Sequence, residues 1–291
     1  MEDTPQNNTV QQTPVVNHTT YDRRSLTYAN TFDSPLKTLT IKLIEWLTGK
    51  LTILRMIRKF EKQGAPEGQA FWNAALNVMG IPLITPQEQI DRIPLTGPVV
   101  VVANHPHGLV DGMILAELIG RRRDDYQILT RALLTGIDEV ASSYLIPVPF
   151  PHEEDAQRKS VEMRAQAMAT LKAGGVISVF PSGVVMSSET MFGPAIEAEW
   201  NVFTAQMIRR SGAKVVPIFF PGSNSRLYQI ANRVSATLRQ SLLLHEIVHS
   251  CNKPLGPIVG HPLTDEQMDK LQRDPRGFMA WLREHTLSLQ D

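Results

Sequence analysis

Two histidines and an aspartate lie close together at residues 104–112, which read Asn-His-Pro-His-Gly-Leu-Val-Asp-Gly. The segment directly follows an apolar run at residues 98–103, so it is placed where a buried strand gives way to a helix. Alpha/beta proteins keep their ligand sites at such strand ends. A histidine held by an aspartate can take a proton from an alcohol near neutral pH, because the carboxylate fixes the tautomer and stabilises the imidazolium. The segment therefore predicts an enzyme with a histidine base.

Either His105 or His107 could be the base that Asp111 orients. His107 lies four residues before Asp111 and would share a helical face with it if the helix began that early. Pro106 and Gly108 instead favour a turn before the helix, and such a turn would bring His105 back toward Asp111. We therefore expect His105 and Asp111 to be the catalytic pair.

Short apolar runs alternate with longer periodic segments through the rest of the chain. The apolar runs predict strands at residues 98–103, 126–130, 144–148, 176–180, 214–220 and near 256–260. Helical periodicity predicts helices at residues 109–119, 155–173, 265–271 and 275–287. This alternation implies an α/β fold with a mainly parallel central sheet flanked by helices.

The N-terminal part differs in character. Residues 1–30 are polar without a period that could bury a face, which predicts a mobile arm. Residues 31–82 form an amphipathic helical region, in which leucines recur at helical spacing over residues 36–60 and basic side chains outnumber acidic ones. The helix either lies on an anionic membrane surface, with Trp46 and Trp72 as interface anchors, or packs on the core with a solvated basic face. The α/β domain then covers residues 83–291.

Composition narrows the class of protein. The chain has 291 residues, 29 basic and 29 acidic, with a net charge of zero, which argues against a nucleic-acid binder. Its one cysteine, Cys251, cannot form an internal disulfide, and the first residues lack the pattern of a signal peptide. No run of roughly 18 apolar residues suits a membrane span. We expect a cytoplasmic protein associated peripherally with the inner face of the membrane.

Four blocks in the same order resemble the glycerolipid acyltransferase superfamily, and in particular its hemolysin-like branch linked to ornithine-lipid and other aminolipid synthesis. The blocks are residues 104–112, Val-Phe-Pro-Ser-Gly at 179–183, Lys-Val-Val-Pro-Ile at 214–218 and Pro-Gly-Ser-Asn-Ser-Arg-Leu at 221–227. The resemblance runs from about residue 98 to the C-terminus. The superfamily usually has four residues between the histidine and the aspartate, whereas five separate His105 from Asp111.

The resemblance implies transfer of a fatty acyl group from an acyl carrier protein or coenzyme A thioester to the hydroxyl of a lyso-lipid, with no other cofactor and no metal. His105 would remove the hydroxyl proton, and backbone N–H groups of residues 180–184 or near Gly108 would hold the oxyanion. The candidate substrate-binding residues, most of them in these blocks, are Asn104, His107, Gly108, Arg131, Arg158, Phe180, Pro181, Ser182, Gly183, Asn224 and Arg226. Arg131 and the run Arg121–Arg123 are candidates for the donor's phosphates or carrier protein, although a solvated charge run also explains the latter.

The acceptor's head group is indicated by a departure from the superfamily pattern. Where the superfamily has Glu-Gly-Thr-Arg after Phe-Pro, with charged residues that help hold the acceptor's phosphate, this chain has Ser-Gly-Val-Val at residues 182–185. A phosphate monoester needs a bidentate guanidinium or several aimed donors, and valines supply neither. This favours a lyso-aminolipid, an N-acylated amino acid or amino sulfonate with a 3-hydroxyacyl chain. A lysophosphatidate is the alternative, because Arg158, Lys159 or Arg226 could supply a cation.

A third possibility comes from residues 245–249, His-Glu-Ile-Val-His, which fit the zinc-protease pattern His-Glu-x-x-His. His245 and His249 would bind zinc one helical turn apart, and Glu246 would serve as the base. A zinc hydrolase needs a third ligand, for which Glu266 or Glu284 can only be nominated. This reading is a distant alternative.

Overall fold

The computed structural model describes residues 27, 29, 34–131, 139–149 and 155–290. The predicted mobile arm therefore lies outside the described residues, apart from Thr27 and Ala29. Within the described part of the chain, no helix has both the length and the apolar character that crossing a bilayer requires.

A six-stranded sheet with the strand order β3-β2-β4-β1-β7-β8 forms the centre of the fold. Its strands are β1 (Val99–Ala103), β2 (Tyr126–Arg131), β3 (Leu145–Val148), β4 (Val176–Val179), β7 (Lys214–Phe219) and β8 (Ile258–Val259). All neighbouring pairs are parallel except β7 and β8. A separate antiparallel pair consists of β5 (Ser187–Ser188) and β6 (Ala195–Ile196). The predicted α/β fold with a mainly parallel sheet is confirmed, and the predicted strand ends differ by one or two residues.

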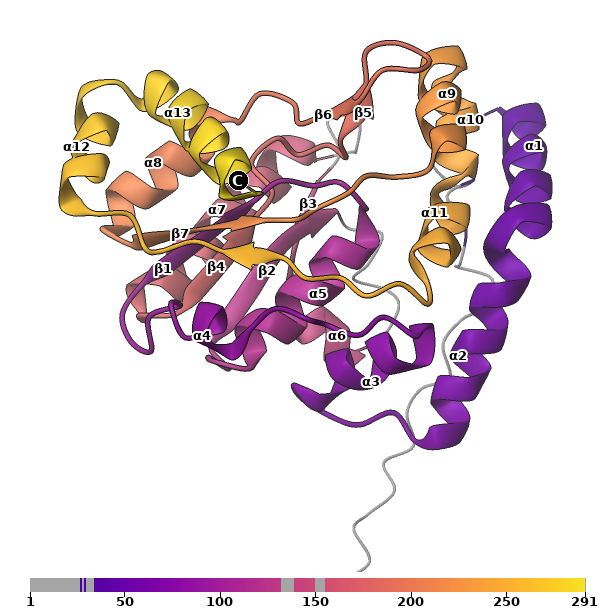
Figure 1. The fold of residues 1–291 in the computed structure, drawn as a ribbon, viewed down its shortest axis with the longest axis horizontal. Coiled ribbons are helices and arrows are strands. Elements are labelled where there is room, and N and C mark those ends of the chain that lie inside the picture. The colour runs from indigo at the N-terminus through magenta and orange to yellow at the C-terminus, as the bar shows by residue number, and fades with distance from the viewer. Residues whose placement is uncertain (1–26, 28, 30–33, 132–138, 150–154, 291) are drawn as a thin grey trace, which may run out of the picture.

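Helices cover both faces of this sheet (Figure 1). One face packs on α3 (Ala70–Met79), α5 (Leu109–Gly120) and α11 (Leu243–Ser250). The other packs on α7 (Ala156–Lys172), α8 (Val202–Ser211), α12 (Asp265–Arg273) and α13 (Pro275–Leu287). Along β1, Val99 and Val101 join the first cluster and Val100 and Val102 the second, so a continuous apolar run is buried on both sides. The shorter elements are α4 (Gln87–Ile90), α6 (Glu139–Ser143) and the 3-10 turn η4 (Ser288–Gln290).

The N-terminal helical region is one long helix along the edge of the molecule (Figure 1). It consists of α1 (Pro35–Glu45), a π-helical turn η2 (Trp46–Lys50) and α2 (Leu51–Gln63). The helices α9 (Arg226–Val234), α10 (Ala236–Ser241) and α11 lie between it and the sheet. Gly49 permits the close approach to α11, because a Cβ there would lie 2.7 Å from the carbonyl oxygen of Leu244.

This helix presents an apolar stripe to solvent as well as a packed face. Ile41 and Ile53 are buried. The exposed stripe consists of Leu36, Leu39, Leu43, Trp46, Leu47 and Leu51. Trp72, which we expected at a membrane interface, is instead buried in the core between Phe71 and Tyr144, so that expectation was wrong. The division of the chain at residue 83 stays a prediction.

Candidate active site

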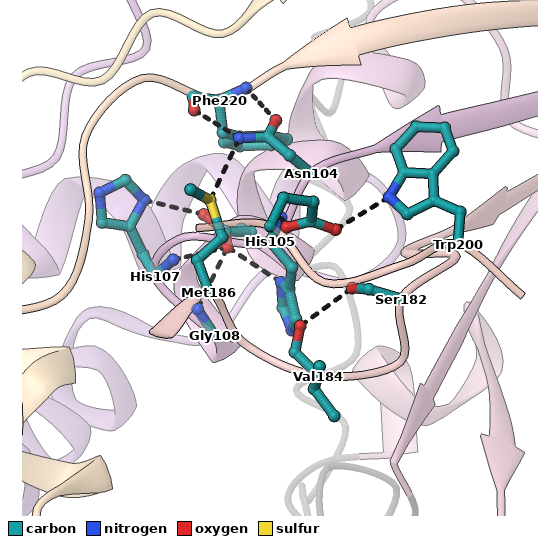
Figure 2. A network of polar contacts seen from close by, with 11 residues as sticks. Asn104, His105, His107, Gly108, Ser182, Val184, Met186, Trp200 and Phe220 are labelled. Atoms are coloured by element: carbon teal, nitrogen blue, oxygen red, sulfur yellow. Dashed lines mark hydrogen bonds and ion pairs between the residues drawn. The ribbon is translucent and has the colours of Figure 1, made fainter. Parts of the chain in front are cut away.

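The turn between β1 and α5 is fixed at its first residue by Asn104, which is fully buried. Its amide Oδ1 accepts from the Phe220 N–H at 2.7 Å, and its Nδ2 donates to the Phe220 carbonyl at 2.9 Å. Nδ2 also contacts the Met186 sulfur at 3.6 Å (Figure 2). Because the amide is saturated, Asn104 joins the ends of β1 and β7 and is not presented to a substrate. We name residues 104–111 the His–Asp turn.

Asp111 is the hub of this turn and has no exposed surface. Its Oδ2 accepts from the His105 Nδ1 at 3.0 Å, the His107 backbone N–H at 2.8 Å and the Gly108 backbone N–H at 3.1 Å. Its Oδ1 accepts from the His107 Nδ1 at 3.0 Å. Gly108 caps the N-terminus of α5 at a φ of 72°, and Asp111 is the third residue of the helix, where a carboxylate reaches back to the first free N–H groups. Both histidines that the sequence left in competition therefore contact the same carboxylate.

The carboxylate is ionised at neutral pH. Burial raises the pKa of Asp111, but the charge of His107 and the hydrogen bonds from His105 and His107 together bring it below the ordinary value of 3.8. An ionised carboxylate can only accept hydrogen bonds, so both imidazoles donate from Nδ1, and each leaves Nε2 without a proton when its ring is neutral. One negative charge thus serves two rings.

The two imidazoles differ in what surrounds them, and they point in different directions from the turn (Figure 2). The His105 ring stacks on Phe180 with centroids 3.9 Å apart, and its side chain is 17% exposed. The His107 side chain is 9% exposed and faces Gly222, where a Cβ would lie 3.1 Å from Nε2. His105 is therefore the more accessible of the two.

A buried glutamate that sequence reasoning missed holds the backbone of His105. The Oε2 of Glu197 accepts from the His105 N–H at 3.1 Å, and its Oε1 accepts from the Trp200 Nε1 at 2.9 Å. The His105 carbonyl in turn accepts from the Met186 N–H at 2.8 Å. The sequence held no signal for these contacts, because they come from segments about eighty to ninety residues away and match no motif.

The Phe-Pro-x-Gly turn lies against the His–Asp turn, as expected. Phe180 supplies the stacking face for His105, and the Pro181 carbonyl accepts from the Asn201 N–H at 2.9 Å. Ser182 donates its hydroxyl to the Val184 carbonyl at 3.0 Å (Figure 2), and Gly183 has a φ of 67°. This segment carries no cationic side chain between residues 180 and 185.

The candidate cations lie in three different settings. Arg131 is the last residue of β2, and its side chain lies outside what the structure describes. Arg158 is exposed on α7, where its guanidinium pairs with Asp155 at 3.2 Å and Glu162 at 2.6 Å. The structure therefore occupies Arg158 with carboxylates of its own helix and does not bring it to the His–Asp turn.

Asn224 and Arg226 lie on the loop that follows β7. The Asn224 N–H donates to the Pro106 carbonyl at 3.2 Å, so this loop is attached directly to the His–Asp turn. Both residues line a cavity of about 590 Å³, which we name the polar cavity. The Arg226 guanidinium donates to the carbonyls of Phe192 and Gly193, between β5 and β6.

The three arginines at residues 121–123 all form ion pairs or hydrogen bonds within the protein. Arg121 pairs with Glu117 at 2.9 Å and Arg122 with Asp91 at 3.0 Å. The Arg123 guanidinium is buried and donates to three backbone carbonyls and to a neighbouring carboxylate. Arg123 is thus neither solvated nor free to dock a carrier protein or coenzyme A.

The residues that fit the zinc-protease pattern form hydrogen bonds within the protein. Glu246 is buried, and its carboxylate accepts from the Ser225 N–H and hydroxyl at 2.6 Å each and from the His245 Nδ1 at 2.9 Å. His249 bonds instead to Lys253 at 3.1 Å. Over the described ranges no cluster of three or more His, Cys, Asp or Glu side chains could hold a metal. Glu246 therefore anchors the loop after β7 and is not placed as a metal-site base.

Comparison with known proteins places these features in a family. The chain is similar to a lyso-glycine lipid O-acyltransferase from Phocaeicola vulgatus, with 24% identity over 188 residues that cover 62% of this chain and 64% of that protein. The chain thus spans less than two thirds of that relative's length. It is also similar to the crystal structure of the 1-acyl-sn-glycerophosphate (LPA) acyltransferase PlsC from Thermotoga maritima, with a TM-score of 0.44 and 15% identity over 84% of this chain and 95% of that chain. The acyltransferase family model matches residues 44–273, most of the chain, and the protein therefore belongs to this acyltransferase family.

Proposed function

We propose that this acyltransferase moves a fatty acyl group from a thioester to the hydroxyl of a lyso-aminolipid. The observation that carries the proposal is the hydrogen bond between the His105 Nδ1 and the buried, ionised Asp111, which leaves the His105 Nε2 free beside the Phe180 turn. A base of this kind is what a lipid hydroxyl needs in order to attack a thioester near neutral pH.

In the proposed reaction the acceptor's hydroxyl oxygen bonds to the thioester carbonyl carbon while its proton moves to the His105 Nε2. The carbon–sulfur bond then breaks, and the imidazolium returns the proton to the departing thiolate. The products are an ester and a free thiol on coenzyme A or acyl carrier protein. Asp111 stabilises the imidazolium between the two steps, and such assistance is worth roughly 100- to 10,000-fold in rate.

Hydrogen bonds within the two turns leave few backbone N–H groups available to stabilise the oxyanion. The Gly108 N–H already donates to Asp111, and the Gly183 N–H to the Phe180 carbonyl. The backbone N–H groups of Ser182 and Val184 have no such acceptor among the described residues. We assign the oxyanion to this pair, because backbone N–H groups aimed at developing charge are a common source of its stabilisation.

The proposed head group of the acceptor follows from the charges of the side chains beside the His–Asp turn. The segment at residues 182–185 offers no guanidinium or ammonium to a phosphate monoester. The relative from Phocaeicola vulgatus is named for a lyso-glycine lipid, whose class matches the expected acceptor. A 1-acylglycerol-3-phosphate acceptor is the second candidate, because Arg226 places one cation at the polar cavity.

We also propose that the N-terminal helix rests on the cytoplasmic face of an anionic membrane. Its exposed leucines recur at helical spacing, and Leu36 is 72% and Leu47 66% exposed. Lys42, Arg58 and Lys59 on the same helix are exposed as well. Buried apolar area and cations near anionic head groups both favour such a position, the latter by about 1 kcal/mol for each basic residue.

The experiment for the membrane proposal is flotation with liposomes that contain phosphatidylglycerol. Changing Leu43 and Leu47 together to Glu should abolish flotation, while the matched change Val161→Glu on α7, where the valine is also exposed, should leave it intact. Equal flotation of both variants would refute this use of the helix.

The experiment for the reaction offers the purified protein a fatty acyl thioester and, in parallel, an N-(3-hydroxyacyl)glycine and a lysophosphatidate, with products identified by mass spectrometry. The glycine acceptor should give the diacylated product, His105→Ala should abolish it, and His261→Ala, at an exposed histidine, should not. Product from lysophosphatidate alone would favour the second candidate. Full turnover by His105→Ala would remove His105 from the mechanism.

A further inference from the structure

The polar cavity adjoins the His–Asp turn on the side of His107. Its lining comes from the segment before β6, the loop after β7, the start of α9 and one residue of α11. Gly222 of this lining lies against the His107 Nε2, and Asn224 is bonded to the Pro106 carbonyl. A ligand in the cavity would therefore lie next to His107, which shares Asp111 with His105.

The lining favours a singly charged anion. Among the lining residues that the structure describes, none is acidic, and Arg226 is the one with a permanent positive charge. Two carbonyls hold the Arg226 guanidinium through a single nitrogen, Nη1. The N-terminus of the nine-residue helix α9 begins at the same place, which adds a favourable dipole. The nearest buried carboxylate, Glu246, is already bonded to Ser225 and His245.

Two buried amides in the lining lack hydrogen-bond partners. Asn224 is 4% exposed, and neither its Oδ1 nor its Nδ2 has a partner among the described residues. Gln229 is 1% exposed; its Oε1 accepts from the Ser188 N–H at 2.8 Å, but its Nε2 has no partner. Buried polar groups are nearly always hydrogen-bonded, and each unmet one costs about 1–3 kcal/mol. A ligand that supplies both a donor and an acceptor would remove this cost.

We infer that the polar cavity binds the head group of an N-acylated amino acid, with its carboxylate at Arg226 and its amide at Asn224 and Gln229. The amide N–H donates to the Asn224 Oδ1, and the amide carbonyl accepts from the Gln229 Nε2. The inference rests on the proposed function, in which the reacting 3-hydroxyl lies two carbons from that amide carbonyl and so stays within reach of the His–Asp turn. A lysophosphatidate has an ester in place of the amide, so it has no N–H group to donate to the Asn224 Oδ1.

The test is calorimetric binding of N-(3-hydroxydecanoyl)glycine, its methyl ester, and the analogue in which an ester oxygen replaces the amide N–H. Arg226→Gln should weaken binding of the free acid by about 10- to 100-fold and leave that of the methyl ester unchanged. Asn224→Leu should weaken binding of the amide and abolish its advantage over the ester analogue. Arg233→Gln, at an exposed arginine of the same helix outside the lining, should change nothing.

Thermal unfolding is the control that each variant is folded. Asn224→Leu should have a Tm no lower than that of the parent, because it removes a buried polar group that has no hydrogen-bond partner. Absence of binding to the parent protein, or binding that Arg226→Gln and Asn224→Leu leave unchanged, would overturn the inference. Acyl transfer to the glycine acceptor with no dependence on Arg226 would do the same and leave the proposed function standing. Binding that depends on both residues, without acyl transfer, would support the cavity and refute the proposed function.

Discussion

Replacing Asp111 with asparagine separates the charge of the carboxylate from its role in positioning. Alanine is unsuitable, because it would leave the buried N–H groups of His107 and Gly108 unpaired at about 1–3 kcal/mol each. Asparagine keeps one oxygen, and the Oδ2 position receives three N–H donors against one at Oδ1. We expect the amide oxygen at the Oδ2 position and the NH₂ group facing His107.

In that arrangement the two histidines respond differently. His105 keeps its proton on Nδ1 and its free Nε2, whereas His107 must accept at Nδ1 and carry its proton on Nε2. The loss at His105 is then the difference between a charged and a neutral acceptor for an imidazolium, about 1–1.5 kcal/mol, which corresponds to about a 5- to 13-fold fall in kcat. If the asparagine instead turned its NH₂ group toward His105, the base would carry its proton on Nε2, and kcat would fall by about 10,000-fold.

The assay is kcat at saturating donor and acceptor for the parent, Asp111→Asn and His105→Ala. Asp125→Asn is the matched control, because Asp125 pairs with Arg123 outside the site. If His105 alone is the base, Asp111→Asn should lower kcat by the same factor in a protein that also carries His107→Ala. A loss below about threefold, or one as large as that of His105→Ala, would refute the reasoning on charge and tautomer.

The same variant tests the pKa of Asp111. Because the folded-state pKa lies below the ordinary value of 3.8, the unfolded chain binds more protons in acid, so the charged carboxylate contributes stability above that value. The difference in free energy of unfolding between the parent and Asp111→Asn should shrink as the pH falls below 3.8 and through the lowered pKa. A difference that grows over this acid range would contradict the assignment.

Three further changes test the surroundings of the site, each by urea unfolding. Glu246→Gln turns an NH₂ group toward the donors of Ser225 or His245 and should cost about 1–3 kcal/mol, with no change in bound zinc. Gly49→Val should be destabilising by more than 1 kcal/mol, because its Cβ would lie 2.7 Å from a carbonyl oxygen of α11. Arg123→Met leaves three carbonyls without their donor and should cost about 2–4 kcal/mol; stability within 0.5 kcal/mol of the parent would contradict any of the three.

Local chemistry explains what the sequence could predict. Apolar runs gave the strands, and the glycine and proline of the His–Asp turn placed the start of α5 correctly. The contact between His105 and Asp111 also follows from the turn, since only five residues separate them. The alternative contact of His107 with Asp111 is present as well, because one carboxylate has room for both rings.

The features that the sequence could not predict depend on contacts between residues far apart in the chain. Nothing in the pattern distinguishes Glu197, whose carboxylate holds the backbone of His105, from a surface glutamate. The leucine period predicted the N-terminal helix, but not that Leu43 faces solvent while Ile41 is buried. Glu246 fits a zinc motif by sequence, yet its partner Ser225 lies twenty-one positions earlier. Such partners depend on how separate elements pack, which periodicity does not encode.

The close approach at Gly49 has a consequence for protein engineering. The η2 turn touches α11 at Leu244, the neighbouring Glu246 holds Ser225, and the next residue, Asn224, is bonded to Pro106. These three contacts connect the N-terminal helix to Pro106, the residue next to the base His105. Replacing the helix at residues 35–63 with a foreign sequence would disturb the reaction centre, so this helix is not a detachable module.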